Sequence, residues 1–158
     1  MQELAAELGI SRATLYRWVG SREQLLGEIL WSLAQLGLQD ADAAATGRGP
    51  ERIVRFYEAF LRLTAAHEPI RRFVESEREG ALRILTSRQG VQQPRLIDAL
   101  RQRLEAAQAA GELVLRLEAA DLAYVMVRIG ESFIWREFIT GEEPDLVTPV
   151  QVVRLLVS

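Results

Sequence analysis

The chain has no cysteine and a single histidine, His67, among its 158 residues. The first absence excludes a disulfide scaffold, and the second leaves almost nothing for a histidine-based metal site. Lysine and asparagine are also absent, so all 19 basic residues are arginine. No apolar run approaches the roughly 20 residues of a membrane helix, and the acidic N-terminus lacks a signal-peptide layout. We therefore expect a cytoplasmic protein with no cofactor, no metal and no membrane partner.

The rest of the composition is that of an ordinary globular protein: 49% hydrophobic and 26% charged, with a net charge of −3. On folding, a chain of this length buries roughly two-thirds of the surface that it exposes when unfolded. It can therefore form a core without disulfide bonds or bound metal ions. Apolar residues recur every three to four positions, and no β-type alternation of useful length occurs. The predicted fold class is all-α, with helices near residues 2–8, 12–18, 22–44, 50–66, 69–87, 94–110, 118–140 and 149–157.

Helix starts and breaks divide the chain into two parts. Capping boxes are expected at residues 21–24 and 148–151, and prolines stand at the start of four predicted helices. Breaks fall at residues 46–49, 89–93 and 141–145. We predict an N-terminal unit with its connecting helix over residues 1–45 and a larger helical bundle over residues 46–158.

Residues 2–18 predict two short helices joined by a tight turn, the helix-turn-helix arrangement. The inner face of the first helix is expected to consist of Leu4, Ala5 and Leu8. Gly9 can end that helix in a left-handed cap, and Ser11 can cap the second helix, whose Leu15 points back at the first.

The outward arc of the second helix suits DNA. Residues 11–22 hold three arginines and no acid, although the whole chain is acidic. Arginine can bind a phosphate or the edge of a guanine, and a small residue allows close approach to a thymine methyl. The predicted DNA-binding residues are Ser11, Arg12, Ala13, Thr14, Tyr16, Arg17, Trp18 and Arg22.

The run LAAELGISRATLYRWVGSREQLL, residues 4–26, resembles the signature of the TetR family of transcriptional regulators. By this resemblance the helix at 12–18 enters the major groove. Tyr16 and Arg22 then stand where the family touches phosphate, and Arg12, Ala13, Thr14 and Arg17 stand where it approaches bases. The resemblance implies a double-stranded DNA operator as partner.

The sequence departs from the family pattern in three places. Trp18 replaces a His or Tyr, and it either donates its indole N–H to phosphate or packs against the next helix. Val19 replaces a Phe but remains a core hydrophobe. The family also has a further helix before the point where this sequence begins, so the first helix of the DNA-binding unit is expected to be missing.

The segment from Tyr124 to Trp135, followed by residues 140–145, resembles the QsdR-type C-terminal domain within the same family. The resemblance implies a domain that binds a small-molecule effector, such as a lactone or acyl-chain compound. It also implies a homodimer formed through the last two long helices.

One stripe of this helix carries Tyr124, Arg128, Glu131 and Trp135 within about 60°. Two interpretations remain open: an Arg128–Glu131 ion pair that closes a core or dimer seam, or an effector pocket with aromatic walls, one donor and one acceptor. The predicted effector-binding residues are Tyr57, Phe60, Phe73, Tyr124, Arg128, Glu131 and Trp135. His67 is expected only to end a helix.

The sequence thus predicts a dimeric transcriptional regulator, a repressor that a small molecule releases from its operator. One alternative is a helical ligand-binding or interaction module that does not bind DNA, as the acidic net charge would suit. A second, a small enzyme using Glu131, Arg128 and Tyr124 as acid–base groups, lacks a nucleophile, a cofactor motif and a metal-ligand set. The chain is therefore predicted not to be an enzyme.

Overall fold

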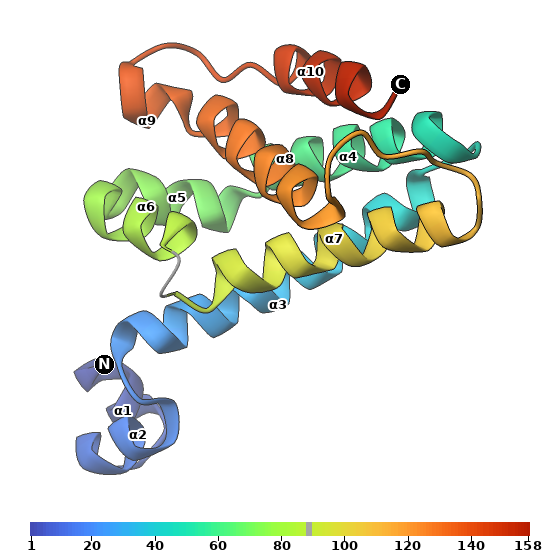
Figure 1. Ribbon diagram of the computed structural model, residues 1–158. Helices are drawn as coiled ribbons and strands as arrows, with labels where there is room; N and C mark the ends of the chain where they lie inside the picture. The colour runs from blue at the N-terminus through green and yellow to red at the C-terminus, as the bar shows by residue number, and fades with distance from the viewer. Residues whose placement is uncertain (88–89) are drawn as a thin grey trace.

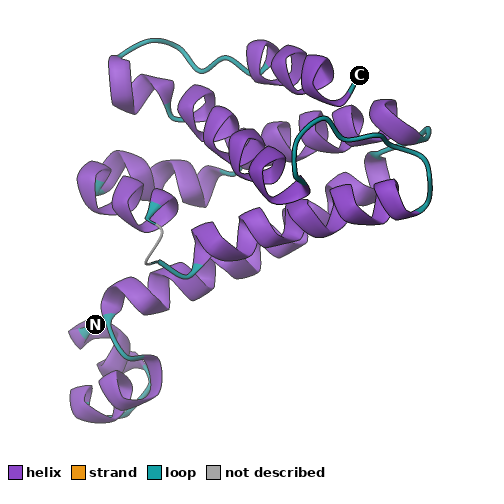
Figure 2. Cartoon of the chain, in the orientation of Figure 1, coloured by secondary structure: helices purple, strands orange, loops and turns teal. Residues whose placement is uncertain are grey.

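The computed structural model describes residues 1–87 and 90–158. Within these ranges the chain forms ten α-helices and no strand (Figure 2). The all-α prediction is confirmed. Of the predicted break at 89–93, Gln89 lies outside the described residues.

Helices α1 (Gln2–Glu7) and α2 (Arg12–Val19) form the N-terminal unit. The predicted left-handed cap is present, because Gly9 has a φ of +65°. The Gly9 N–H donates to the Ala6 carbonyl and the Ile10 N–H to the Ala5 carbonyl, which is the Schellman pattern. Ser11 caps α2 by accepting a hydrogen bond from the Thr14 N–H at 3.1 Å.

Burial in this unit centres on Ala5 and Leu15, which are 3% and 2% exposed. Leu8 was predicted to lie on the inner face, but it is 55% exposed. The reason is that α1 ends at Glu7, so Leu8 belongs to the turn rather than to the packed helical face.

Helix α3 (Arg22–Ala44) runs from the N-terminal unit along the length of the bundle (Figure 1). The predicted capping box opens it. The Gln24 N–H donates to the Ser21 hydroxyl, and the Ser21 N–H donates to the Gln24 side-chain carbonyl. Helix α3 therefore belongs to both parts of the molecule.

The bundle is built on α4 (Gly49–Ala66), which packs against α3, α8 (Ala119–Ile134) and α10 (Val147–Val157). Helix α7 (Gln92–Ala109) packs against α3 and α8. The most deeply buried side chains of this core include Val54, Tyr57, Leu104, Leu122, Met126 and Val153. None of the described helices is long and apolar enough to cross a bilayer.

Two helices expected to be continuous are each divided. The segment 69–87 consists of α5 (Glu68–Ser76) and α6 (Arg78–Thr86), separated at Glu77 with φ −134° and ψ 45°. The segment 118–140 consists of α8 and α9 (Arg136–Thr140), separated at Trp135 with φ −94° and ψ 15°. Neither break involves glycine or proline. Tertiary packing favours both, because Glu77 binds α3 and Trp135 is buried.

The capping box predicted at residues 148–151 is wrong. Helix α10 begins at Val147, and the Asp145 carboxylate accepts hydrogen bonds from the Val147 N–H at 2.8 Å and the Thr148 N–H at 3.1 Å. The Thr148 hydroxyl donates to the same carboxylate at 2.6 Å. These bonds lower the pKa of Asp145, so the helix start is held by a charged acceptor.

Candidate functional site

The outer surface of α2 gathers the residues predicted to meet DNA. The predicted DNA-binding residues on α2 are all exposed except Thr14, which is half-buried. The Ser11 and Thr14 hydroxyls share a hydrogen bond of 2.9 Å. Leu15 anchors the opposite face in the small core. The helix therefore presents its polar side chains to solvent as one surface.

Arginines on this surface are available to an external anion. Among residues 1–87 and 90–158, neither Arg12 nor Arg17 forms an ion pair with a carboxylate. Trp18 is 64% exposed, so it does not pack against the next helix as one of its two predicted roles required. Its indole N–H remains accessible.

Arg22 has a different environment. Its guanidinium binds the Glu77 carboxylate in a two-pronged pair, with Nη1 donating to Oε2 at 2.8 Å and Nη2 donating to Oε1. This hydrogen bonding lowers the pKa of Glu77. The next residue, Glu23, pairs with Arg83 of α6. Two ion pairs thus connect the first turn of α3 to the α5–α6 segment.

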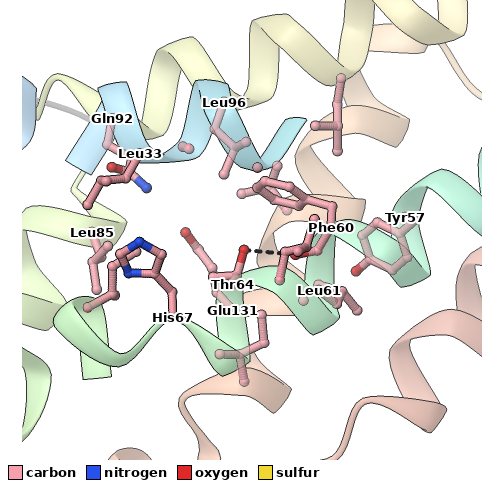
Figure 3. Close-up of a pocket in the computed structure, with 18 of the residues that line it drawn as sticks. Leu33, Tyr57, Phe60, Leu61, Thr64, His67, Leu85, Gln92, Leu96 and Glu131 are labelled. Atoms are coloured by element: carbon pink, nitrogen blue, oxygen red, sulfur yellow. Dashed lines mark hydrogen bonds between the residues drawn. The ribbon is translucent and has the colours of Figure 1, made fainter. Parts of the chain in front are cut away.

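A cavity of about 270 Å³ lies between α3, α4, α7 and α8, with α5 and α6 at one side. Its wall is largely aliphatic and aromatic, as Figure 3 shows for Leu33, Phe60 and Leu85. A mainly apolar wall with a few polar groups is typical of small-molecule sites. The residues that line the cavity include Leu33, Asp40, Thr64, His67, Gln92 and Leu96.

Four of the seven predicted effector residues line this cavity: Tyr57, Phe60, Glu131 and Trp135. Phe73, Tyr124 and Arg128 do not. The cavity-facing side of α8 is formed by Met126, Val127, Gly130 and Ile134, with Glu131 at its edge. Tyr124 and Arg128 lie about 20° and about 60° beyond Glu131 around the helix, further from the cavity-facing side. On α5, Ile70 rather than Phe73 reaches the wall.

Glu131 fits both interpretations drawn from the sequence, the ion pair and the cavity wall. It forms the expected ion pair with Arg128, whose Nη1 lies 3.0 Å from Oε2. It also accepts hydrogen bonds from Gln93 Nε2 at 2.8 and 2.9 Å, and it lines the cavity. Burial raises the pKa of Glu131 to about 7, against the lowering effect of Gln93 and Arg128.

Tyr57 holds α4 against α8. Its hydroxyl donates to the Met126 carbonyl at 2.7 Å and lies beside Gly130. Burial, followed by the nearby Glu131 charge, raises the pKa of Tyr57. The phenol is therefore a neutral donor, and its ring forms part of the cavity wall.

The polar cavity residues that the sequence did not predict include His67 and Gln92, as well as Asp40 and Thr64. His67 stands between α4 and α5, and its backbone N–H donates to the Thr64 carbonyl, as a helix end requires. Its imidazole, however, lines the cavity. Gln92 was placed in a break between helices, but it is the first residue of α7 and only 8% exposed. A buried glutamine is not distinguishable from a loop glutamine by its local pattern.

Comparisons with known proteins show which family and which solved structure the chain resembles. The family described as "Tetracyclin repressor-like, C-terminal domain" matches residues 48–158. No curated protein matches the chain. Among solved structures, the transcriptional repressor QsdR of R. erythropolis, from the TetR family, is similar with a TM-score of 0.91 and 26% sequence identity. The match covers 99% of this chain and 82% of that one.

Proposed function

Because the chain belongs to the TetR family of transcriptional regulators, we propose that it is a repressor that leaves its operator when a small molecule fills the cavity. A TetR-family protein is a regulator and not an enzyme, as the sequence predicted. One observation carries the proposal: α3 both bears Arg22 beside the DNA-binding unit and lines the cavity with Leu33 and Asp40. The similar QsdR protein is named a repressor.

The DNA-binding part of the proposal comprises residues 1–45. Arg12, Ala13, Thr14 and Arg17 would face bases in the major groove, with Ser11, Tyr16, Trp18 and Arg22 at phosphates. Two observations support this assignment: the surface is exposed, and Arg12 and Arg17 have no carboxylate partner within the described ranges. Residues 46–158 would bind the effector and form the dimer.

The effector would contact Tyr57, Phe60, Glu131 and Trp135, with Arg128 acting through its ion pair to Glu131. A molecule in this cavity touches α3 as well as His67, Ile70 and Leu85 on the α4–α6 side. Filling it would shift α3 relative to α5 and α6. The recognition helices of a dimer would then no longer match adjacent major grooves.

Effector binding and operator binding would affect each other equally. If the effector lowers operator affinity by some factor, the operator must lower effector affinity by the same factor. A ligand-bound form and a DNA-bound form with the same spacing of recognition helices would contradict the mechanism.

The homodimer would form through α8 and α10, which pack against each other. Tyr124 on α8 and Leu155 on α10 are 53% and 74% exposed. Val125, Ile129 and Phe133 add a half-buried apolar stripe along α8. Apolar side chains repeated along one face favour a subunit interface.

The proposal is tested by binding of the full-length protein to DNA from upstream of its own gene at two salt concentrations. A Tyr16→Ala/Arg17→Ala variant should bind at least about tenfold more weakly, because both a phosphate contact and a base contact are lost. Affinity of the wild type should fall steeply with salt. The matched control is Arg116→Ala, an exposed arginine in the α7–α8 loop, which should bind like the wild type.

A folded dimer that shows no DNA binding, or only salt-insensitive binding, would contradict the regulator proposal. That result would favour a helical ligand-binding module instead.

A further inference from the structure

The cavity has one polar end, formed by His67 and Gln92. In Figure 3 the imidazole and the amide point toward each other across the space, with Leu33 and Leu85 beside them. His67 Nδ1 and Gln92 Oε1 are both buried and have no hydrogen-bond partner among the residues that the structure describes. Gln92 is only 8% exposed, so water has little access to its side chain.

Buried polar atoms without a partner are rare, because the hydrogen bonds that they made to water in the unfolded chain are not replaced. Nδ1 and Oε1 do not bond to each other, so a group placed between them could satisfy both. An imidazole nitrogen donates or accepts according to its tautomer, and an amide side chain presents both an N–H and a carbonyl. A hydroxyl satisfies any combination in which at least one of the two groups donates, because it donates one hydrogen bond and accepts others.

Charge limits the ligand further. Among the described residues, the cavity wall contains no arginine, and its two carboxylates are Glu131 and Asp40. A carboxylate ligand would therefore meet two acidic groups, with His67 as the one described wall residue that can carry a positive charge. An ammonium ligand would lack a free buried counter-ion, because Glu131 already accepts from Gln93 and Arg128 while Asp40 is exposed. An uncharged head group is favoured on both counts.

Volume sets the size of the ligand. At about 30 Å³ for each water-sized group, 270 Å³ admits about nine non-hydrogen atoms. Apart from the polar groups already named and Thr64, the wall is apolar. An aliphatic or aromatic body therefore fits the remaining space.

We propose that the effector is an uncharged amphiphile whose hydroxyl group lies between His67 and Gln92 and whose apolar body fills the rest of the cavity. This inference rests on the proposed effector role of the cavity and specifies its ligand class. A lactone ring without a hydroxyl offers only hydrogen-bond acceptors, so the Gln92 carbonyl would receive no hydrogen bond from it.

The test is direct binding without DNA, by calorimetry on the full-length protein. Octanol, octanoate, octylamine and γ-octalactone serve as probes of similar size with different heads. Octanol should bind at least about tenfold more tightly than each of the others. In Gln92→Leu and in His67→Phe this preference should fall to about twofold or less.

Gln108→Leu, the same change as Gln92→Leu at an exposed position of α7 outside the cavity lining, is the matched control and should keep the preference. Thermal unfolding of each variant reports whether it is folded, and His67→Phe, at a half-buried position, decides the question if Gln92→Leu does not fold. Equal or tighter binding of another probe would overturn the proposal, as would no binding of octanol or an unchanged preference in both folded variants.

Release of DNA by octanol is a separate measurement. Octanol binding that is lost in the variants, but that leaves operator affinity unchanged, would uphold the ligand class and contradict the proposed regulatory function instead.

Discussion

Gly130 determines how closely α8 approaches α4. A Cβ atom at this position would lie 2.9 Å from the Tyr57 hydroxyl oxygen and 2.9 Å from Leu61 Cδ2. Tyr57 and Leu61 are 1% and 2% exposed, so neither side chain has room to move aside. The α8 backbone would have to shift, with loss of the hydrogen bond from Tyr57 to Met126.

We expect Gly130→Ala to lower the free energy of unfolding by about 1–3 kcal/mol, measured by urea denaturation. Gly80→Ala in α6 is the matched control, because the nearest atom to its Cβ is Glu77 Oε2 at 4.0 Å. An unhindered helical position should gain about 0.5–1 kcal/mol. A Gly130→Ala protein as stable as the wild type would show that α8 and α4 can separate without cost.

Glu131 makes stability depend on pH. Burial raises its pKa from an ordinary 4.5 to about 7, so the folded chain holds this proton more tightly than the unfolded chain. The resulting stabilisation is complete below the unfolded pKa and is lost as the pH rises through about 7. Its size is about 3 kcal/mol.

The prediction is that wild type loses more unfolding free energy than Glu131→Gln when the pH is raised from about 5 to about 8. Comparing the two proteins cancels groups with lowered pKa, such as Asp145, which act in the opposite direction at lower pH. Glu143→Gln, in the exposed α9–α10 loop, should follow the wild-type profile. Parallel profiles for wild type and Glu131→Gln would mean that this carboxyl does not titrate in that interval.

At the scale of elements, the α5–α6 segment holds Arg22, a residue proposed to bind a DNA phosphate, through Glu77. The guanidinium that would bind a phosphate is already paired with Glu77 at the break between these helices. His67, Ile70 and Leu85 place the same segment at the cavity wall. In the proposed mechanism, the break at Glu77 would therefore link effector binding to operator affinity.

Glu77→Ala should tighten operator binding roughly two- to fivefold, because an exposed ion pair that opposes the complex is worth at most about 1 kcal/mol. The measurement is operator affinity at low salt, where the effect is largest. Glu79→Ala removes the same charge two residues along the chain and should change affinity less. Equal effects of the two variants would indicate general charge repulsion rather than competition for Arg22.

At the scale of the whole molecule, operator binding requires two correctly spaced copies of α2. The proposed α8–α10 interface supplies them. In a two-fold symmetric dimer each substitution occurs twice, so a small change at an exposed position has a doubled effect. Tyr124 and Leu155 are exposed enough to be changed without opening the core.

We expect Tyr124→Glu/Leu155→Glu to be monomeric in sedimentation velocity and to lose operator affinity by at least about tenfold, because like charges would replace apolar contacts. Val114→Glu, at an 83% exposed position in the α7–α8 loop, is the control and should remain dimeric. A double variant that stays dimeric would place the interface on another surface.

Local rules were sufficient for much of the molecule. The helix-turn-helix, its Gly9 and Ser11 caps, the Ser21 capping box and the course of α3 follow from interactions within a few residues, and each is present as predicted. The Arg128–Glu131 pair, three residues apart on one helix, is of the same kind. The sequence by itself also determined the family, because the residues of the second helix and its turn lie close together along the chain.

Tertiary structure alone decided the rest. The breaks at Glu77 and Trp135, the burial of Gln92 and the orientation of His67 depend on segments far away along the chain. The sequence predicts that Tyr124, Arg128, Glu131 and Trp135 share a stripe, but only Glu131 and Trp135 line the cavity, because the packing of α4 and α7 against α8 decides which side faces it. Periodicity fixes which residues share a helical face, whereas only packing fixes what that face meets.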